Sequence, residues 1–157
     1  MFNHLLVPLD GSEYSQRALA TATDLARVTG ARITLLGVIW RPQAPGVPHV
    51  EKLDDQSRKR VHDYLETLAA PVRKAGVAQV DAEVRFGQPA DEIAHVAADA
   101  GVDLILMSTH GLGASGRYAL GSVALKVLMS APAPVLMVRI PEQTGMPQEV
   151  AVATARR

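Results

Sequence analysis

Apolar residues along the chain follow two alternating patterns. Short runs rich in apolar and β-branched residues predict five strands, of which the third alternates with polar residues as an edge strand does. The strands span His4 to Leu9, Ala31 to Trp40, Val77 to Phe86, Val102 to Thr109 and Val135 to Ile140. Between them, apolar residues recur every three or four positions and predict four helices. The helices span Glu13 to Thr29, Glu51 to Ala75, Pro89 to Ala100 and Ser122 to Ala131.

Residues with special backbone or capping chemistry fall at the expected ends of these elements. Ser12 is placed to cap the first helix, and Gly30 is placed to end it in the left-handed region. Pro71 is expected to kink or fray the last turn of the second helix. Residues 41–50 are rich in proline and predict an irregular loop, whereas Pro141 to Arg157 predict a flexible tail.

Alternating strands and helices of this kind are typical of an α/β protein with an open, doubly wound parallel sheet. The chain of 157 residues fits one such domain, which we expect to cover residues 1–140. In these folds ligands bind outside the carboxyl ends of the strands, where the strand order reverses. We therefore expect the chemistry after the first, second and fourth strands.

Composition excludes several classes of function. The chain has no cysteine, which removes thiol catalysis, thiolate zinc sites and disulfides. Basic and acidic residues both number 16, so no net charge favours a nucleic acid or a membrane surface as partner. The five histidines have no metal-ligand spacing, and neither an export signal nor a membrane span is visible. A cytoplasmic location is the expectation.

The loop after the fourth strand matches two nucleotide motifs incompletely. Residues Gly111 to Gly116 fit G-x-G-x-x-G, but no carboxylate occurs from Leu104 to Pro141 to bind the ribose of a dinucleotide. Arg117 and Tyr118 stand where a P-loop needs Lys and Ser or Thr. Neither a dinucleotide site nor a P-loop is therefore predicted.

The same loop nevertheless suits an anion. Its glycines surround the start of a predicted helix, whose unpaired N–H groups and dipole favour a phosphate. The absence of acids nearby, with Arg117, Lys126 and Arg139 present, agrees with this. The alternative is that the glycines only serve tight turns.

Three motifs in order resemble the universal stress protein family over residues 4–140. They are VPLDGSEYS, LLGVI and LMSTHG-x9-GSVALKVL-x5-PVLMV. Nucleotide-binding members carry G-x-x-G-x9-G-[ST], and Gly111, Gly121 and Ser122 match three of the four motif positions. Ser108 stands at the first glycine position. The resemblance implies an adenine nucleotide α-hydrolase-like sheet of strand order 3-2-1-4-5.

The resemblance also assigns roles to individual residues. Pro8 and Asp10 would flank the nucleoside, with Asp10 accepting hydrogen bonds from the ribose, and the main chain of Val38 would read the adenine edge. The phosphates would lie on a loop that includes the residues Met107, Ser108, Gly111, Arg117, Gly121, Ser122 and Val123.

Simpler structural roles remain open for the same residues. Asp10 is equally suited to form the turn before Gly11, and Ser122 to cap a helix. A strand valine such as Val38 is more often a core residue, and Arg117 can be a solvated charge. His110 is read as structural.

The function implied by the resemblance is an ATP-binding regulator of the stress response, with at most slow hydrolysis and with Mg²⁺ arriving on the nucleotide. A homodimer through Val135 to Ile140 is expected, because an apolar edge strand invites pairing. The alternative is a family member that binds no nucleotide and acts as a dimeric interaction module. A pyrophosphatase is disfavoured, because DGSEYS lacks the S-G-G-x-D-S pattern of that class.

Overall fold

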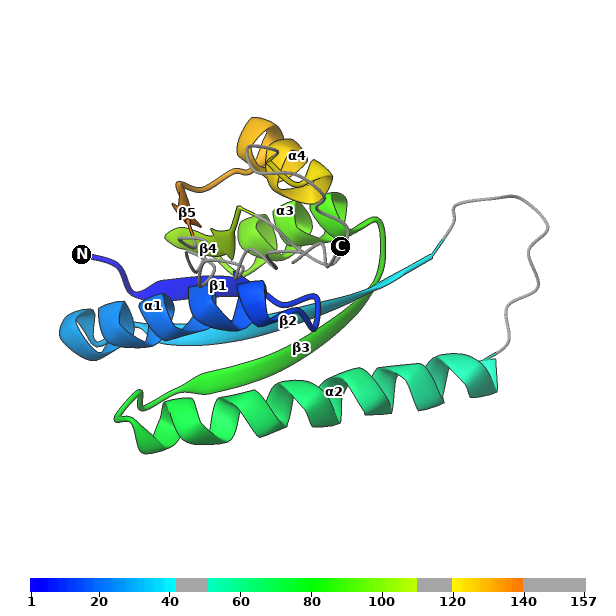
Figure 1. Ribbon diagram of the computed structural model, residues 1–157, viewed down its shortest axis with the longest axis horizontal. Coiled ribbons are helices and arrows are strands. Elements are labelled where there is room, and N and C mark those ends of the chain that lie inside the picture. The colour runs from blue at the N-terminus through cyan, green and yellow to red at the C-terminus, as the bar shows by residue number, and fades with distance from the viewer. Residues whose placement is uncertain (42–50, 110–119, 140–157) are drawn as a thin grey trace, which may run out of the picture.

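The computed structural model describes residues 1–41, 51–109 and 120–139. Five strands and four helices alternate along the chain (Figure 1). They are β1 (His4–Pro8), α1 (Glu13–Thr29), β2 (Arg32–Trp40), α2 (Glu51–Lys74), β3 (Val80–Gly87), α3 (Pro89–Asp99), β4 (Leu104–Ser108), α4 (Ser122–Ser130) and β5 (Val135–Val138). The strands form one parallel sheet in the order β3-β2-β1-β4-β5, which confirms the expected α/β fold.

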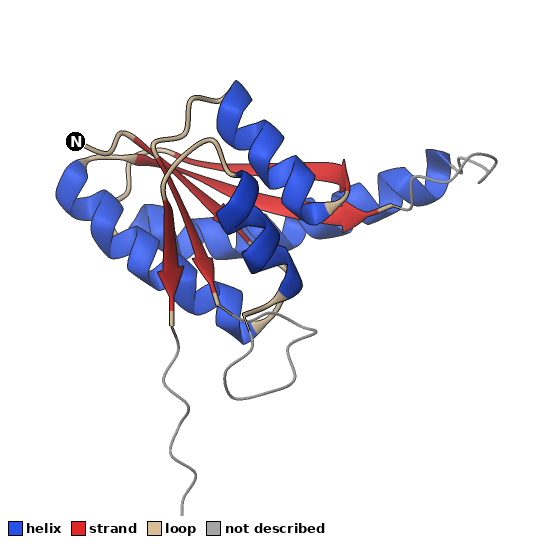
Figure 2. Cartoon of the chain, turned by 90° about the horizontal axis from the view of Figure 1, so that it is seen from above, coloured by secondary structure: helices blue, strands red, loops and turns tan. Residues whose placement is uncertain are grey.

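Helices cover both faces of the sheet, as the doubly wound arrangement requires. Helices α1 and α2 pack on one face around a buried cluster that includes Leu5, Leu35 and Leu65. Helices α3 and α4 pack on the other face around Leu36, Ile93 and Val127. Figure 2 shows the twisted fan of strands between these layers. The switch in strand order therefore falls between β1 and β4.

Helix α1 begins and ends as its sequence predicts. The Ser12 hydroxyl accepts a hydrogen bond from the Ser15 N–H at 3.2 Å. Gly30 follows the helix with φ of 74°, and its N–H donates to the Ala26 carbonyl. This left-handed position is one that glycine adopts without the steric cost of a Cβ.

Two expectations about the end of α2 and the start of the following strand are corrected. Of the expected kink or fraying at Pro71, the fraying is absent, because α2 continues to Lys74 and the Ala75 N–H donates to the Pro71 carbonyl at 2.9 Å, whereas the kink stays a prediction. The third strand begins at Val80 rather than at Val77. The Val77 N–H instead donates to the Val72 carbonyl and the Gly76 N–H to Arg73, so that these residues close the end of α2. Their turn geometry outweighs the apolar character of Val77.

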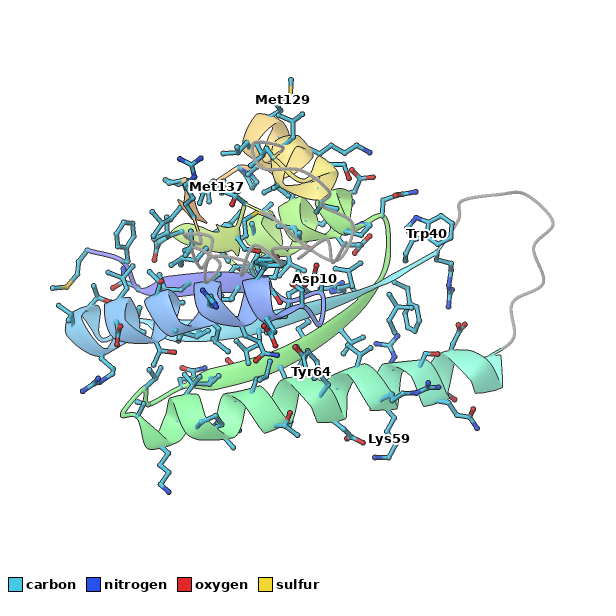
Figure 3. All side chains as sticks on the ribbon, in the orientation of Figure 1. Asp10, Trp40, Lys59, Tyr64, Met129 and Met137 are labelled. Atoms are coloured by element: carbon cyan, nitrogen blue, oxygen red, sulfur yellow. The ribbon has the colours of Figure 1, made fainter. Side chains whose placement is uncertain are left out.

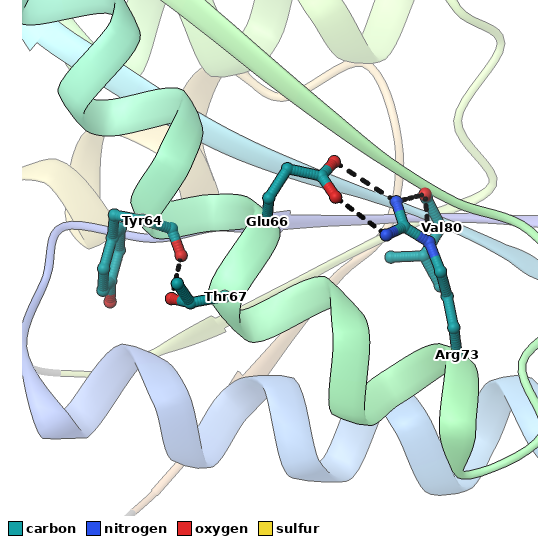
Figure 4. A network of polar contacts seen from close by, with 5 residues as sticks. All are labelled: Tyr64, Glu66, Thr67, Arg73 and Val80. Carbon is teal, nitrogen blue, oxygen red and sulfur yellow. Dashed lines mark hydrogen bonds and ion pairs between the residues drawn. The ribbon is translucent and has the colours of Figure 1, made fainter.

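The two edges of the sheet differ in protection. On β3, the Arg58 guanidinium donates to the Val84 carbonyl at 3.2 Å, and Arg73 donates to the Val80 carbonyl. A bidentate pair with Glu66 holds Arg73 in place (Figure 4). Side chains of α2 thus cover part of the β3 edge and hinder pairing with another strand.

The other edge strand, β5, is short and none of its residues is fully buried. Apolar side chains are exposed here and on the neighbouring α4, among them Leu125, Leu128, Met129 and Leu136. We call these four residues together the β5–α4 apolar surface; Leu136 alternates with Val135 and Met137, which contact the α3–α4 core, and therefore lies on the α1 face of the edge strand. Within the described part of the chain, no helix is long and apolar enough to cross a membrane.

Candidate functional site

Unequal strand lengths form a step at the carboxyl edge of the sheet. The pairing of β1 with β2 ends at Pro8 and Leu36, followed by one hydrogen bond of 2.8 Å from the Leu9 N–H to the Leu36 carbonyl. Strand β2 continues four residues beyond Leu36, to Trp40, which is about 13 Å at about 3.3 Å per residue. It stays paired with β3 up to Gly87. The ends of β1 and β4 thus form a floor, and β2 forms a wall beside it.

The backbone of Val38 lies on the open side of this wall. Successive residues of a strand direct their N–H and C=O groups to opposite sides. The Leu36 carbonyl bonds toward β1, so the backbone groups of Val38 face the same side, where the β1 pairing has ended. The side chain of Val38 is half-buried against the α3–α4 core. Val38 is therefore both a core contact, as the simpler interpretation held, and a backbone donor and acceptor at the step.

Asp10 forms the turn that leads from β1 into α1. Its Oδ1 accepts a hydrogen bond from the Ser12 N–H at 3.0 Å and another from the Ser12 hydroxyl at 2.6 Å. The simpler interpretation of Asp10 as a turn residue is thus confirmed. The residue is also exposed, and it lies at the start of α1 beyond the end of β1 (Figure 3). Its ribose role stays a prediction.

The start of α4 is tied to the end of β4. The Gly121 N–H donates to the Thr109 carbonyl at 2.9 Å, and the Gly121 carbonyl accepts from the Leu125 N–H. Gly121 is therefore the N-cap residue, and Ser122 is the first residue of the helix rather than its cap. In the first turn, the N–H groups of Ser122 and Val123 have no acceptor within the helix. They suit an anion at this position.

The backbone of Gly121 does not itself require glycine. Its φ of −57° and ψ of 146° are open to any residue. Among the described residues, an added Cβ would meet only the Thr109 carbonyl oxygen, at 3.5 Å, which is ordinary contact. Neither the backbone conformation nor the described neighbours therefore require glycine at position 121.

The floor of the step is formed by residues of β1 and β4. Continuing the register of Leu6 with Ile105 places Pro8 beside Met107. Met107 is buried in the α3–α4 core, and Ser108 is buried as well at 7% exposure. Neighbouring side chains on a strand alternate, so the Ser108 side chain points to the α1 side of the sheet. The extra hydroxymethyl group of Ser108 is thus accommodated within the protein.

The remaining predicted residues cannot be placed. Gly111, Arg117 and His110 lie outside the described residues. Trp40 was not among the residues expected at the site, since the step depends on strand register, which the sequence pattern does not reveal. Among the residues that the structure describes, no group of three or more histidines, aspartates or glutamates could hold a metal ion.

Comparison with known proteins fixes the family. The model of the universal stress protein family matches residues 1–139. A curated relative from Thermus aquaticus, a "universal stress protein in QAH/OAS sulfhydrylase 3'region", is 36% identical over 140 residues, which are 88% of this chain and 100% of that protein. The chain belongs to the universal stress protein family. The resemblance stated for residues 4–140 is thereby confirmed.

Solved structures agree with this universal stress protein fold. The hypothetical protein MJ0577 superposes with a TM-score of 0.80 at 28% identity, covering 89% of this chain and 97% of that one. A universal stress protein in complex with cAMP has a TM-score of 0.69 at 24% identity, covering 87% and 97%. A universal stress protein from Archaeoglobus fulgidus in complex with dAMP has a TM-score of 0.63 at 19% identity, covering 87% and 97%. The last two similarities establish the shared fold alone.

Proposed function

We propose that this universal stress protein binds an adenine nucleotide, with ATP as the working ligand, in the step at the carboxyl edge of the sheet. One observation carries the proposal: the open backbone of Val38 on β2 and the start of α4, fixed to Thr109, lie at the same edge of the sheet. The first suits the edge of a base, and the second suits a phosphate. The universal stress proteins solved with cAMP and dAMP support an adenine nucleotide as the ligand class.

Each part of the nucleotide has a chemically suitable partner. The N–H and C=O of Val38 would pair with the adenine edge, which offers both an acceptor and a donor. Pro8 would lie under the nucleoside, and the Asp10 carboxylate would accept hydrogen bonds from the ribose. The Ser12 bonds to Asp10 Oδ1 fix the orientation of this carboxylate before any ligand arrives.

The phosphates would lie at the start of α4. The N–H groups of Ser122 and Val123, with the Ser122 hydroxyl, would donate to phosphate oxygens. Gly111 and Arg117, which precede Gly121 in the sequence, complete the set expected from the sequence. Mg²⁺ would arrive on the phosphates, because the described residues supply no carboxylate cluster of their own.

The proposed role is that of a regulator with at most slow hydrolysis, acting in the cytoplasm as a homodimer. Fast hydrolysis needs a positioned base or nucleophile, and Asp10 is already engaged with Ser12 in the turn. For the dimer, the β5–α4 apolar surface is the support, since the β3 edge is partly covered by Arg58 and Arg73 while β5 carries exposed Leu136.

A second candidate function is a dimeric interaction module that binds no nucleotide. Ser108 at the first glycine position of the motif favours it, as does the β5–α4 apolar surface. The burial of the Ser108 side chain on the α1 side of the sheet argues against a steric block, so we rank nucleotide binding first.

Isothermal titration calorimetry tests the proposal and distinguishes the ligands. The purified protein is titrated with Mg-ATP, AMP and cAMP, with Mg-GTP as the control for the base. We expect ATP to bind more tightly than AMP or cAMP, because it adds phosphates at α4. We also expect it to bind more tightly than GTP, because the donors and acceptors on the guanine edge do not match the N–H and C=O of Val38. No heat with any of them at millimolar concentration would favour the interaction module.

A further inference from the structure

We propose that the indole of Trp40 stacks on the base of the bound nucleotide and contributes to its affinity. This inference rests on the proposed function, because it assigns a residue to the base in the same step. Trp40 is the last residue of β2 and forms the top of the wall beside the ends of β1 and β4. Figure 3 shows it farther along the sheet edge than Asp10.

The side-chain face of Trp40 follows from the alternation of β2. Leu36 and Val38 contact the α3–α4 core, whereas Leu35 and Ile39 contact the α1–α2 core. Trp40 lies two residues beyond Val38 and therefore on the same face of the sheet. That is the face on which α4 begins. A base paired with the Val38 backbone thus has the Trp40 side chain next along the strand.

The indole is exposed although its backbone is firmly held. Its exposed fraction is 61%. By contrast, Phe86 of β3, which pairs with Ile39, is covered by the guanidinium groups of Arg41 and Arg58. Trp40 pairs with Gly87 of β3, and the next residue, Arg41, donates its N–H to the Gly87 carbonyl at 3.3 Å. A fixed strand end with an open aromatic face is a suitable platform for a planar base.

The side chain of Arg41 strengthens this anchorage. Its guanidinium lies 4.4 Å from the centre of the Phe86 ring and forms an ion pair with Asp54 of α2. Strand β2 is thereby attached to β3 and to α2 immediately after Trp40. The backbone of Trp40 is thus held in place before a ligand binds, so only the side-chain torsions of the indole are left to be ordered when a base stacks on it.

Fluorescence provides a direct test, because Trp40 is the only tryptophan in the sequence. Excited at 295 nm, the full-length protein is titrated with Mg-ATP and with ribose 5-phosphate, which lacks a base. We expect ATP to quench or shift the emission with the Kd measured by calorimetry, and ribose 5-phosphate to leave it unchanged. N-acetyltryptophanamide, free in solution, serves as the control for collisional quenching.

Two variants separate stacking from other effects. Trp40→Ala is expected to weaken ATP binding about tenfold, the effect of losing one stacked base. Trp40→Phe keeps an aromatic face and is expected to retain most of the affinity. Thermal melting of each variant checks that it folds.

The outcomes distinguish this inference from the proposed function. Nucleotide binding by calorimetry, with unchanged Trp40 emission and full affinity in Trp40→Ala, would overturn the stacking and leave the nucleotide site intact. Absence of nucleotide binding to the wild-type protein would overturn both.

Discussion

The Gly121 N–H donates to the Thr109 carbonyl at 2.9 Å, which joins the end of β4 to the start of α4. Because the Gly121 N–H is used in this way, the amides of Ser122, Val123 and Ala124 are those without an acceptor within the first turn. A phosphate at this place would contact a helix end that is held to β4 by a hydrogen bond.

Replacing Asp10 separates its turn role from its predicted ribose role. Asp10→Asn keeps an oxygen that can accept from Ser12, so the Tm should stay close to that of the wild type. The loss of the carboxylate should weaken ATP binding about tenfold, as for a hydrogen bond to a charged group. Calorimetry with ATP and with 2',3'-dideoxy-ATP tests this directly. Only the wild type should prefer ATP strongly, and an equal preference in both proteins would remove Asp10 from the ribose site.

The packing of α2 on the sheet depends on the missing side chain of Gly37. A Cβ there would lie 2.5 Å from Val61 Cγ1 and 3.4 Å from Leu65 Cδ1. We expect Gly37→Ala to lower the free energy of unfolding by about 1–3 kcal/mol, measured by urea denaturation. The same change in a Val61→Ala background should cost less, since the clashing methyl group is gone. Equal costs in both backgrounds would contradict this packing.

Acid should destabilise the fold through His4. Its Nε2 lies 2.8 Å from the Thr34 hydroxyl, and its Nδ1 lies 3.0 Å from the Arg32 guanidinium. Burial, and secondly Arg32, hold the pKa of His4 below its usual value, while the Ala100 carbonyl, Asp103 and Asp81 act in the opposite direction. The unfolded chain thus takes up the proton first, at about pH 6.5. Stability is complete above that pH and falls as the pH drops toward the folded-state pKa.

Urea denaturation between pH 7.5 and 5.5 measures this effect. His4→Gln should reduce the dependence of the unfolding free energy on pH. If His4→Gln keeps the wild-type dependence, His4 does not control stability in this range.

The β5–α4 apolar surface predicts self-association. We expect a dimer by analytical ultracentrifugation at micromolar concentration, and Leu136→Glu should convert it to a monomer, because the charge would be buried in the contact. Val28→Glu is the control, since Val28 is 84% exposed at the end of α1. A monomeric wild type, or a dimer unaffected by Leu136→Glu, would contradict the proposed interface.

Much of the fold could be predicted from sequence because its signals are local. Ser12 and Gly30 set the limits of α1 through capping and backbone freedom, and the continuous apolar runs identified the strands. The third strand was predicted to begin at Val77 because this residue is apolar. The hydrogen bonds of the turn at Gly76 instead make Val77 part of the end of α2.

The candidate site was less predictable because it depends on register and on bonds between distant residues. The extension of β2 beyond β1, which opens the Val38 backbone and places Trp40, follows from pairing across strands. The hydrogen bonds from Ser12 to Asp10 likewise establish the turn role, which the Asp-Gly sequence alone leaves open.

Thermal unfolding with and without excess Mg-ATP tests the central claim most directly. Ligand at 100 times its Kd adds about 2.7 kcal/mol of stability, so the wild-type Tm should rise by several degrees. Gly121→Asp should fold and lose this shift in Tm, because its carboxylate would repel the phosphates. Gly121→Ala should also keep the fold, because its Cβ would make only ordinary van der Waals contact with the Thr109 carbonyl. A wild-type Tm that does not change at millimolar Mg-ATP, or a shift that persists in Gly121→Asp, would contradict the account.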